Sequence, residues 1–148
     1  MSASIADIKD RYRRYVVEVI NQGNLDALGE FVAADVKWYT PAPGFTGDYE
    51  GLEAYLSMLL EAFPDFEFGL EDLVVEGDKL VARSVWTGTH RAPFLGVAAT
   101  ERRVRVAGLD LCRFADGKIV EHWANFDAFG LMSQLGAPIA RKPDLNVN

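Results

Sequence analysis

Residues 114–136 have the sequence FADGKIVEHWANFDAFGLMSQLG, and this stretch is the best guide to the fold of the chain. Asp116-Gly117 is a dipeptide that two-residue β-hairpin turns favour, because it tolerates the positive φ angles that such turns require. Aliphatic and aromatic side chains dominate on both sides of it, which predicts two antiparallel strands joined at this turn. Apolar side chains then follow at helical spacing as far as Gly136, which predicts a short helix over residues 128–134.

This hairpin is the last part of a β-rich half of the chain. Gly77-Asp78 is a second hairpin signal, and residues 91–99, which contain a proline and a glycine, form a longer connection. Consecutive strands joined by tight turns pair antiparallel, so we expect one largely antiparallel sheet. The predicted strands are residues 66–76, 79–90, 100–114 and 118–127.

The first half of the chain has a helical pattern. Apolar residues at three- and four-residue spacing predict a helix over residues 4–22, with Ser4 as its N-cap and Gly23 at its end. Helices followed by a run of antiparallel strands are typical of an α+β domain, whose long curved hairpins can enclose a cavity. The other elements expected in this half are a short helix capped by Asn24, a strand over 35–40 and a helix over 49–62.

The length and composition fit one globular domain. Hydrophobic side chains make up 49% of the 148 residues and charged side chains 25%, an ordinary balance. No repeat or linker divides the sequence. We therefore expect a single domain over residues 1–148, with a core of about 5–136 and a polar, disordered tail over 137–148.

Charge and composition limit the partners and the location of the protein. The formal net charge of −7 disfavours nucleic acid and anionic membrane surfaces as partners. Cys112 is the only cysteine, so an intrachain disulfide is impossible. The sequence has no secretion signal and no apolar run near the roughly 18 residues of a membrane span, so we expect a cytoplasmic protein.

Several chemistries lack the residues that they need. The sequence has no Gly-rich phosphate loop, no His-Glu-x-x-His motif and no cysteine pair, so nucleotide and structural zinc sites have no support. Ser57 and Ser84 have no nucleophile-elbow context. Carboxyl and imidazole groups are the remaining candidates for chemistry.

The last predicted strand carries the first of these candidates. Side chains alternate along a strand, so every second residue from Ile119 to Asp127 should share one face. Trp123 and Asn125 belong to this set, and such groups are what a ligand-lined wall would contain. The pattern equally allows a solvent-facing strand end at which Asp127 caps the following helix. His122 has the opposite parity, which places it at an oligomer contact or in solvent.

Two further titratable residues are candidates. Asp110 has apolar neighbours, and if its face is interior the carboxyl must be neutral, hydrogen-bonded or functional, because an unpaired buried charge is costly. The pattern also allows Asp110 to be exposed near the rim of the sheet. His90 shares a strand face with Trp86 and could relay protons near pH 7, although a lone histidine is more often structural.

Several segments share the pattern of one known family. They are Tyr15–Asp26, Gly51–Tyr55, Phe63–Phe66, Gly88–His90 with Phe94–Gly96, and most specifically Phe114–Trp123 with Asp127 and Gly130–Gly136. Through these segments, residues 8–136 resemble the SnoaL-like polyketide cyclases of the nuclear-transport-factor-2-like superfamily. The resemblance implies a cone-shaped, curved and mostly antiparallel sheet, wrapped by the N-terminal helices around an apolar pocket.

The resemblance also implies a reaction, the intramolecular aldol-type ring closure of an aromatic polyketide ester or a similar hydrophobic small molecule, without a cofactor. Asp127 then acts as general acid/base, because an acidic residue at the end of the last strand has that role in the family. His90 is the second catalytic candidate. The residues expected to bind substrate are Trp86, Trp123, Asn125, Asp110, Trp38 and Tyr15.

One segment departs from the family pattern. Many relatives have a Pro-x-Thr-Gly-like turn where this chain has Val97–Glu101, near the expected cavity mouth, so the substrate can differ from a tetracyclic polyketide. The alternatives are an isomerase or an epoxide hydrolase in the same fold, or a noncatalytic protein that binds a hydrophobic ligand. A hydrolase would need a second carboxylate and an arginine, and Arg113 has the wrong parity. The resemblance further implies a homodimer, with an apolar outer sheet face formed by Leu109, Leu111, Val120 and Phe126.

Overall fold

A computed structural model describes residues 4–138 of the chain. The predicted tail over 137–148 lies almost entirely outside these residues. The helices are α1 (Ile5–Tyr15), α2 (Leu28–Phe31), α3 (Tyr49–Ala62) and α4 (Ala128–Leu135), with a π-helical segment η1 (Val16–Asn21) and a 3-10 turn η2 (Leu25–Ala27). The strands are β1 (Val32–Trp38), β2 (Glu67–Glu76), β3 (Lys79–Thr89), β4 (Arg103–Ala115) and β5 (Lys118–Phe126).

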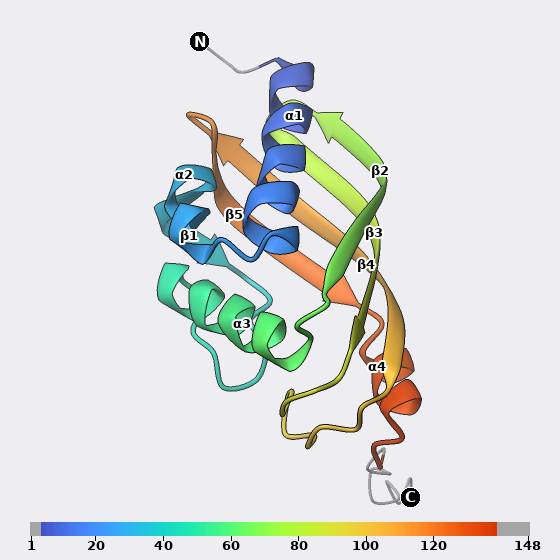
Figure 1. The fold of residues 1–148 in the computed structure, drawn as a ribbon. Coiled ribbons are helices and arrows are strands. Elements are labelled where there is room, and N and C mark those ends of the chain that lie inside the picture. The colour runs from blue at the N-terminus through green and yellow to red at the C-terminus, as the bar shows by residue number, and fades with distance from the viewer. Residues whose placement is uncertain (1–3, 139–148) are drawn as a thin grey trace, which may run out of the picture.

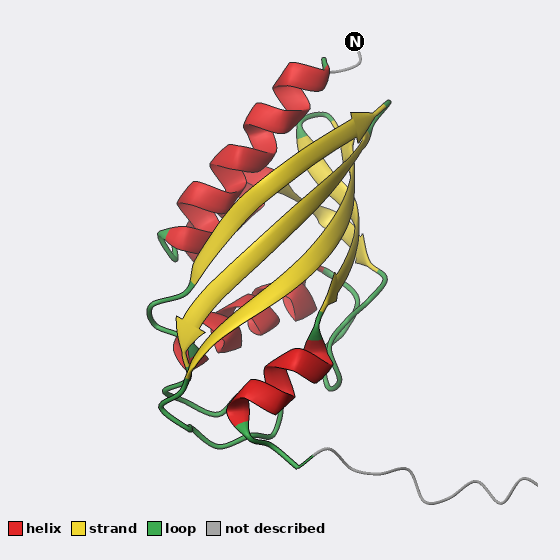
Figure 2. Ribbon diagram, turned by 90° about the vertical axis from the view of Figure 1, so that its right-hand side faces the viewer, coloured by secondary structure: helices red, strands yellow, loops and turns green. Residues whose placement is uncertain are grey.

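The strands form one curved sheet in the order β1-β5-β4-β3-β2 (Figure 1). β1 runs parallel to β5, and the other three pairs are antiparallel. The strands bend around the helices, so that α1 and α3 cover the concave face (Figure 2). The α+β prediction with a curved, mostly antiparallel sheet is therefore confirmed, and the edges β1 and β2 leave the sheet open.

Local signals fix the ends of the first and last helices. The Ser4 hydroxyl accepts a hydrogen bond from the Asp7 backbone N–H at 3.1 Å, and the Asp7 carboxylate accepts one from the Ser4 N–H, which completes a capping box. Gly136 ends α4 with a φ of +67°. Both predictions are confirmed. The prediction for Asn24 is wrong, because its side chain makes no capping bond and the chain enters α2 through η2.

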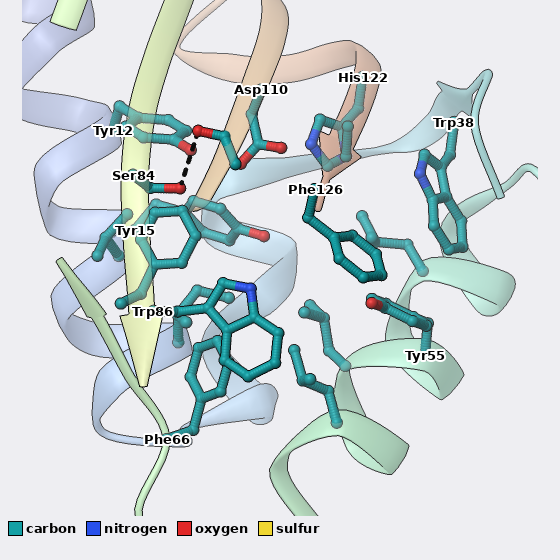
Figure 3. A pocket seen from close by; sticks show the side chains of 18 residues that line it. Tyr12, Tyr15, Trp38, Tyr55, Phe66, Ser84, Trp86, Asp110, His122 and Phe126 are labelled. Carbon is teal, nitrogen blue, oxygen red and sulfur yellow. Dashed lines mark hydrogen bonds between the residues drawn. The ribbon is translucent and has the colours of Figure 1, made fainter. Parts of the chain in front are cut away.

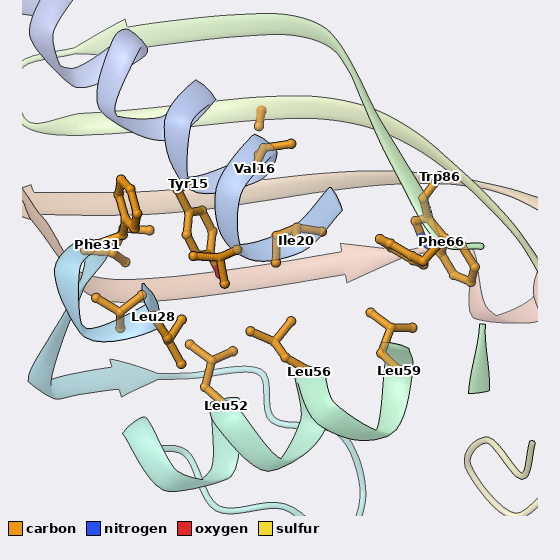
Figure 4. Close-up of a cluster of buried hydrophobic side chains, with 14 of the residues drawn as sticks. Tyr15, Val16, Ile20, Leu28, Phe31, Leu52, Leu56, Leu59, Phe66 and Trp86 are labelled. Carbon is orange, nitrogen blue, oxygen red and sulfur yellow. The ribbon is translucent and has the colours of Figure 1, made fainter. Parts of the chain in front are cut away.

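The helices bury their apolar sides against one another and against the sheet. Val19 and Leu28 have no exposed surface. Figure 4 shows Leu52 of α3 directed toward Leu28, and Leu59 toward Phe66 and Trp86. Each such side chain stabilises the fold by roughly 1.5–3 kcal/mol. None of the helices in the described part of the chain combines the length and apolar character that crossing a bilayer requires.

Candidate active site

A cavity of about 100 Å³ lies between the concave face of the sheet and α1, η1 and α3 (Figure 3). Aliphatic and aromatic groups, including Phe66 and Phe126, form most of its wall. The side chains that bring polar atoms to this wall are Tyr12, Tyr15, Trp38, Tyr55, Ser84, Trp86, Asp110 and His122.

The first helix lines the cavity with residues from two kinds of helical turn. Tyr12 and Tyr15 belong to α1, whereas Val16 and Ile20 belong to the π-helical segment η1. A π-helical turn holds more residues than an α-helical turn, so residues five apart, such as Tyr15 and Ile20, lie closer to one face. Burial raises the pKa of both tyrosine hydroxyls, which stay protonated at neutral pH.

A β-bulge in β5 decides which of its side chains face the cavity. Phe114 pairs with Ile119, but the preceding residue, Arg113, pairs with Glu121. One residue of β5, Val120, is therefore extra in the pairing with β4. An extra residue reverses the alternation of faces for everything beyond it.

Beyond this bulge the face assignment expected from the sequence is wrong. His122, Ala124 and Phe126 line the cavity, and Trp123 and Asn125 do not. Phe126 is therefore absent from the outer apolar face on which it was expected. The one local hint was the small side chain of Ala124 between two bulky residues of the same parity, which leaves open space in front of it.

Asp127 also lies outside the cavity wall. Its side chain is exposed at the start of α4, where Oδ1 accepts a hydrogen bond from the Gly130 N–H at 2.8 Å. Of the two interpretations that the pattern allowed, helix capping is confirmed, and the placement of Asp127 on the pocket wall is wrong. The bulge at Val120 explains the wrong placement, because Asp127 and Trp123 have the same parity and the bulge turns this set of residues away from the cavity.

His90 is fully buried but does not line this cavity. Its Nδ1 accepts a hydrogen bond from the Thr100 N–H at 3.2 Å, and its ring stacks on Phe63 with 5.4 Å between ring centroids. Burial lowers the pKa of His90, so the imidazole is neutral at neutral pH. This position is that of a structural histidine which anchors the connection between β3 and β4, and the expected pocket position is wrong.

Asp110 brings a carboxyl group into the apolar cavity wall, and the alternative of an exposed rim position is excluded. Burial raises the pKa of Asp110 to about 7. The Tyr12 hydroxyl opposes this rise, because a hydrogen bond donated to the carboxylate favours its charged form. Three other residues expected to bind substrate, Tyr15, Trp38 and Trp86, line the same cavity.

His122 is a functional candidate that strand parity did not predict, since parity placed it at an oligomer contact or in solvent. Because Asp110 pairs with Ala124 and Cys112 pairs with His122, the side chains of Asp110 and His122 are diagonal neighbours across β4 and β5 (Figure 3). Burial lowers the pKa of His122 to about 4. Its imidazole is therefore neutral at pH 7 and offers one N–H donor and one nitrogen acceptor.

This arrangement suits proton transfer. A carboxyl group whose pKa lies near 7 accepts and returns a proton with little energetic penalty, and a neutral imidazole beside it can hydrogen-bond to a substrate oxygen. The cavity is small beside the roughly 300–1,000 Å³ of most ligand pockets, so a ligand with several rings must displace wall side chains. Among the described residues, no group of three or more His, Cys, Asp or Glu side chains is placed to hold a metal ion.

Known proteins resemble this chain in both sequence and fold. The model of the SnoaL-like polyketide cyclase family matches residues 10–135. Nogalonic acid methyl ester cyclase of Streptomyces nogalater is 30% identical over 83% of this chain and 93% of its own length. Aklanonic acid methyl ester cyclase DnrD of Streptomyces peucetius is 32% identical over 84% of this chain and 88% of its own. The structure of TsrD from Streptomyces laurentii superposes with a TM-score of 0.83 at 31% identity, and covers 92% of this chain and 99% of TsrD.

Proposed function

The chain belongs to the SnoaL-like polyketide cyclase family, and from this premise we propose that it closes a ring in a hydrophobic polyketide ester by an intramolecular aldol reaction. Asp110 acts as the general acid/base of this reaction. The observation that carries the proposal is the position of Asp110. Among the described residues that line the cavity, it is the one carboxyl group, and its pKa lies near 7.

The proposed reaction needs no reactant other than the substrate. The Asp110 carboxylate removes a proton from a carbon next to a carbonyl group, and the electron pair of that C–H bond delocalises into an enolate. The enolate carbon attacks a second carbonyl carbon of the same molecule, which forms the C–C bond and moves the carbonyl π electrons onto oxygen. The protonated Asp110 then returns its proton to this alkoxide, so product and substrate are isomers.

The apolar wall contributes in two ways. It holds the substrate in a folded conformation in which the two reacting carbons are close, and such orientation is worth up to several kcal/mol of the barrier. It also raises the pKa of Asp110, because burial disfavours the carboxylate. A well-placed acid/base group of this kind contributes typically 10²–10⁴-fold.

The geometry gives less support to the hydrolase alternative. An epoxide hydrolase would hold its water between two carboxylates and an arginine. Arg113 points to the outer face of the sheet, where its Nη2 lies 2.6 Å from the Glu121 carboxylate, and Asp127 caps α4. Neither reaches the cavity that Asp110 lines.

A matched pair of variants tests the proposal. Aromatic polyketide methyl esters are incubated with wild-type protein, Asp110→Asn and Asp127→Asn, and the products are separated by liquid chromatography and mass spectrometry. We expect an isomeric cyclised product from wild type and Asp127→Asn, and at least a 10²-fold slower reaction from Asp110→Asn. Loss of turnover in Asp127→Asn with full activity in Asp110→Asn would refute the assignment. Unchanged ligand binding by all three proteins without any product would favour a noncatalytic binding protein.

We also propose that the outer face of the sheet pairs two copies of the chain. Val74, Val81, Leu111 and Trp123 are consecutive partners across β2, β3, β4 and β5, so they form one apolar row on the face away from the helices. Tyr39 extends the row, stacked on Trp123 at 4.7 Å between ring centroids. Sedimentation velocity tests this, with Val81→Lys expected to turn a dimer into a monomer. A monomeric wild type at high concentration would refute it.

A further inference from the structure

Three polar side chains cross the cavity in a row. Trp38 is the register partner of His122 in the parallel pair β1–β5, and His122 is the diagonal neighbour of Asp110. Figure 3 shows Asp110, His122 and Trp38 side by side along one end of the cavity, above the apolar groups that include Phe66 and Trp86. Because neighbouring strands lie about 4.8 Å apart, the row spans roughly 10 Å between the axes of β4 and β1.

The indole nitrogen of Trp38 has no hydrogen-bond partner. The side chain is 4% exposed, and among the described residues none accepts a bond from Nε1, which is also shielded from solvent. Buried tryptophan N–H groups usually find a partner, since an unmade hydrogen bond is costly. Figure 3 places the nitrogen on the edge of the ring that faces His122. This donor is therefore oriented toward the polar row, and no residue in the described part of the chain accepts its hydrogen bond.

We propose that the Trp38 N–H binds the substrate oxygen on which negative charge develops, and this inference rests on the proposed ring closure. An indole N–H only donates, so its ligand partner must be an acceptor such as a carbonyl oxygen. When the C–C bond forms, the π electrons of the attacked carbonyl become a lone pair on that oxygen. The hydrogen bond from Nε1 strengthens as this charge grows, which lowers the barrier rather than only improving binding.

The residues at the two ends of the row have different roles. Asp110 at one end exchanges the proton of the C–H bond, and Trp38 at the other end stabilises the oxygen of the attacked carbonyl. His122 lies between them, within reach of the enolate oxygen. The substrate therefore carries two carbonyl groups, one that acidifies the C–H bond and one that is attacked. The neighbours of Nε1 cover it, so a ligand must displace one wall side chain to reach it.

Binding can be tested without turnover. 1-Indanone and indane are neutral two-ring probes that differ by one carbonyl oxygen. The indole ¹⁵N–¹H resonances of ¹⁵N-labelled protein are recorded with each probe, and Trp38→Phe identifies the Trp38 signal. We expect indanone to move the Trp38 proton downfield and indane not to do so. Trp38→Phe should weaken indanone binding about 5–10-fold and leave indane binding unchanged, as expected for one neutral hydrogen bond. A Trp38 signal equally insensitive to both bound probes would overturn the inference.

Kinetics separate this inference from the proposed function. With an ester that wild type cyclises, Trp38→Phe should lower kcat on the order of 10²-fold with a much smaller change in KM. Retention of the wild-type kcat would refute the role of Trp38 while leaving Asp110 and the ring closure intact. Conversely, the selective indanone shift without any turnover in wild type would support the carbonyl site and count against the cyclase function. Indane binding by Trp38→Phe shows that the variant keeps its pocket.

Discussion

The burial that prepares Asp110 for catalysis should cost stability at high pH. We expect Asp110→Asn to be more stable than wild type at pH 8 and nearly equal to it at pH 4. The folded protein retains the proton of Asp110 up to about pH 7, whereas the unfolded chain releases it near pH 3.8. Because the folded state binds more protons in this window, wild type loses stability as the pH rises through it. Asparagine is uncharged at every pH, and its side-chain oxygen can still accept a bond from Tyr12.

The magnitude follows from the two pKa values. The change from 3.8 to about 7 corresponds to about 4 kcal/mol at pH 8. For a domain of this size that is a difference of roughly 10 °C in melting temperature. Thermal unfolding followed by circular dichroism at pH 4, 6 and 8 measures the difference between the two proteins at each pH. The titration of His122 is common to both proteins and cancels in that difference.

Asp127→Asn is the control, because asparagine also caps helices and the side chain is exposed. Its melting temperature should differ from wild type by the same small amount at all three pH values. If the difference between Asp110→Asn and wild type were likewise constant from pH 4 to pH 8, the carboxyl would not be held protonated by burial. Asp110 would then not have a pKa near 7 and would not serve as the acid/base group of the proposed reaction.

Three further predictions follow from the same structure. Tyr12→Phe removes a hydrogen bond that lowers the pKa of Asp110, so the acid limb of the pH profile of kcat/KM should move to higher pH. An unmoved acid limb would contradict the role of Tyr12. Asp127→Ala loses the N-cap of α4 and should lower the free energy of unfolding by about 1 kcal/mol in urea titrations while turnover stays at the wild-type rate. Gly88→Ala would place a Cβ 2.9 Å from the Cβ of Phe63, and should destabilise the fold by about 1–3 kcal/mol. Gly77→Ala is the control, because a Cβ at this position meets open space. Gly77 has a φ of +62°, so this variant should show only the smaller cost of its backbone conformation.

Elements whose signals are local were predictable from the sequence. The capping box of Ser4 and Asp7, the Asp116-Gly117 turn and the stop at Gly136 each depend on a few adjacent residues, and all three occur in the structure. The helical stripes and β-rich runs are also properties of short windows. These local signals therefore predicted the order of the elements, and this order indicated the α+β class and the family resemblance.

The faces of β5 were not predictable in the same way. Whether Val120 is an extra residue depends on how β5 pairs with β4, so it is a property of two strands and not of one. A single shift of this kind moves every later side chain to the other face. Simple alternation along β5 therefore predicts the correct strand but puts Trp123, in place of His122, on the pocket wall.

Asp110 shows a second limit of prediction from the sequence. Sequence parity grouped Asp110 with apolar residues but could not tell an interior face from a rim, because that depends on whether α1 covers the sheet. The structure supplies this covering helix through Tyr12 and Tyr15, whose burial is nearly complete. Once that cover exists, desolvation raises the pKa of the Asp110 carboxyl, and the hydrogen bond from Tyr12 limits the rise.

The same desolvation acts in opposite directions on the two titratable neighbours. It raises the pKa of Asp110 to about 7 and lowers that of His122 to about 4, so between these values both side chains are uncharged. The cavity then holds no counter-charge for an ionised ligand, which favours a neutral ester over a free carboxylate. Near pH 7 Asp110 is divided between its two forms, and only Asp110 changes charge during a reaction cycle. A single group that takes and returns one proton is sufficient for an isomerising ring closure, and the stability lost at pH 8 is the thermodynamic counterpart of that function.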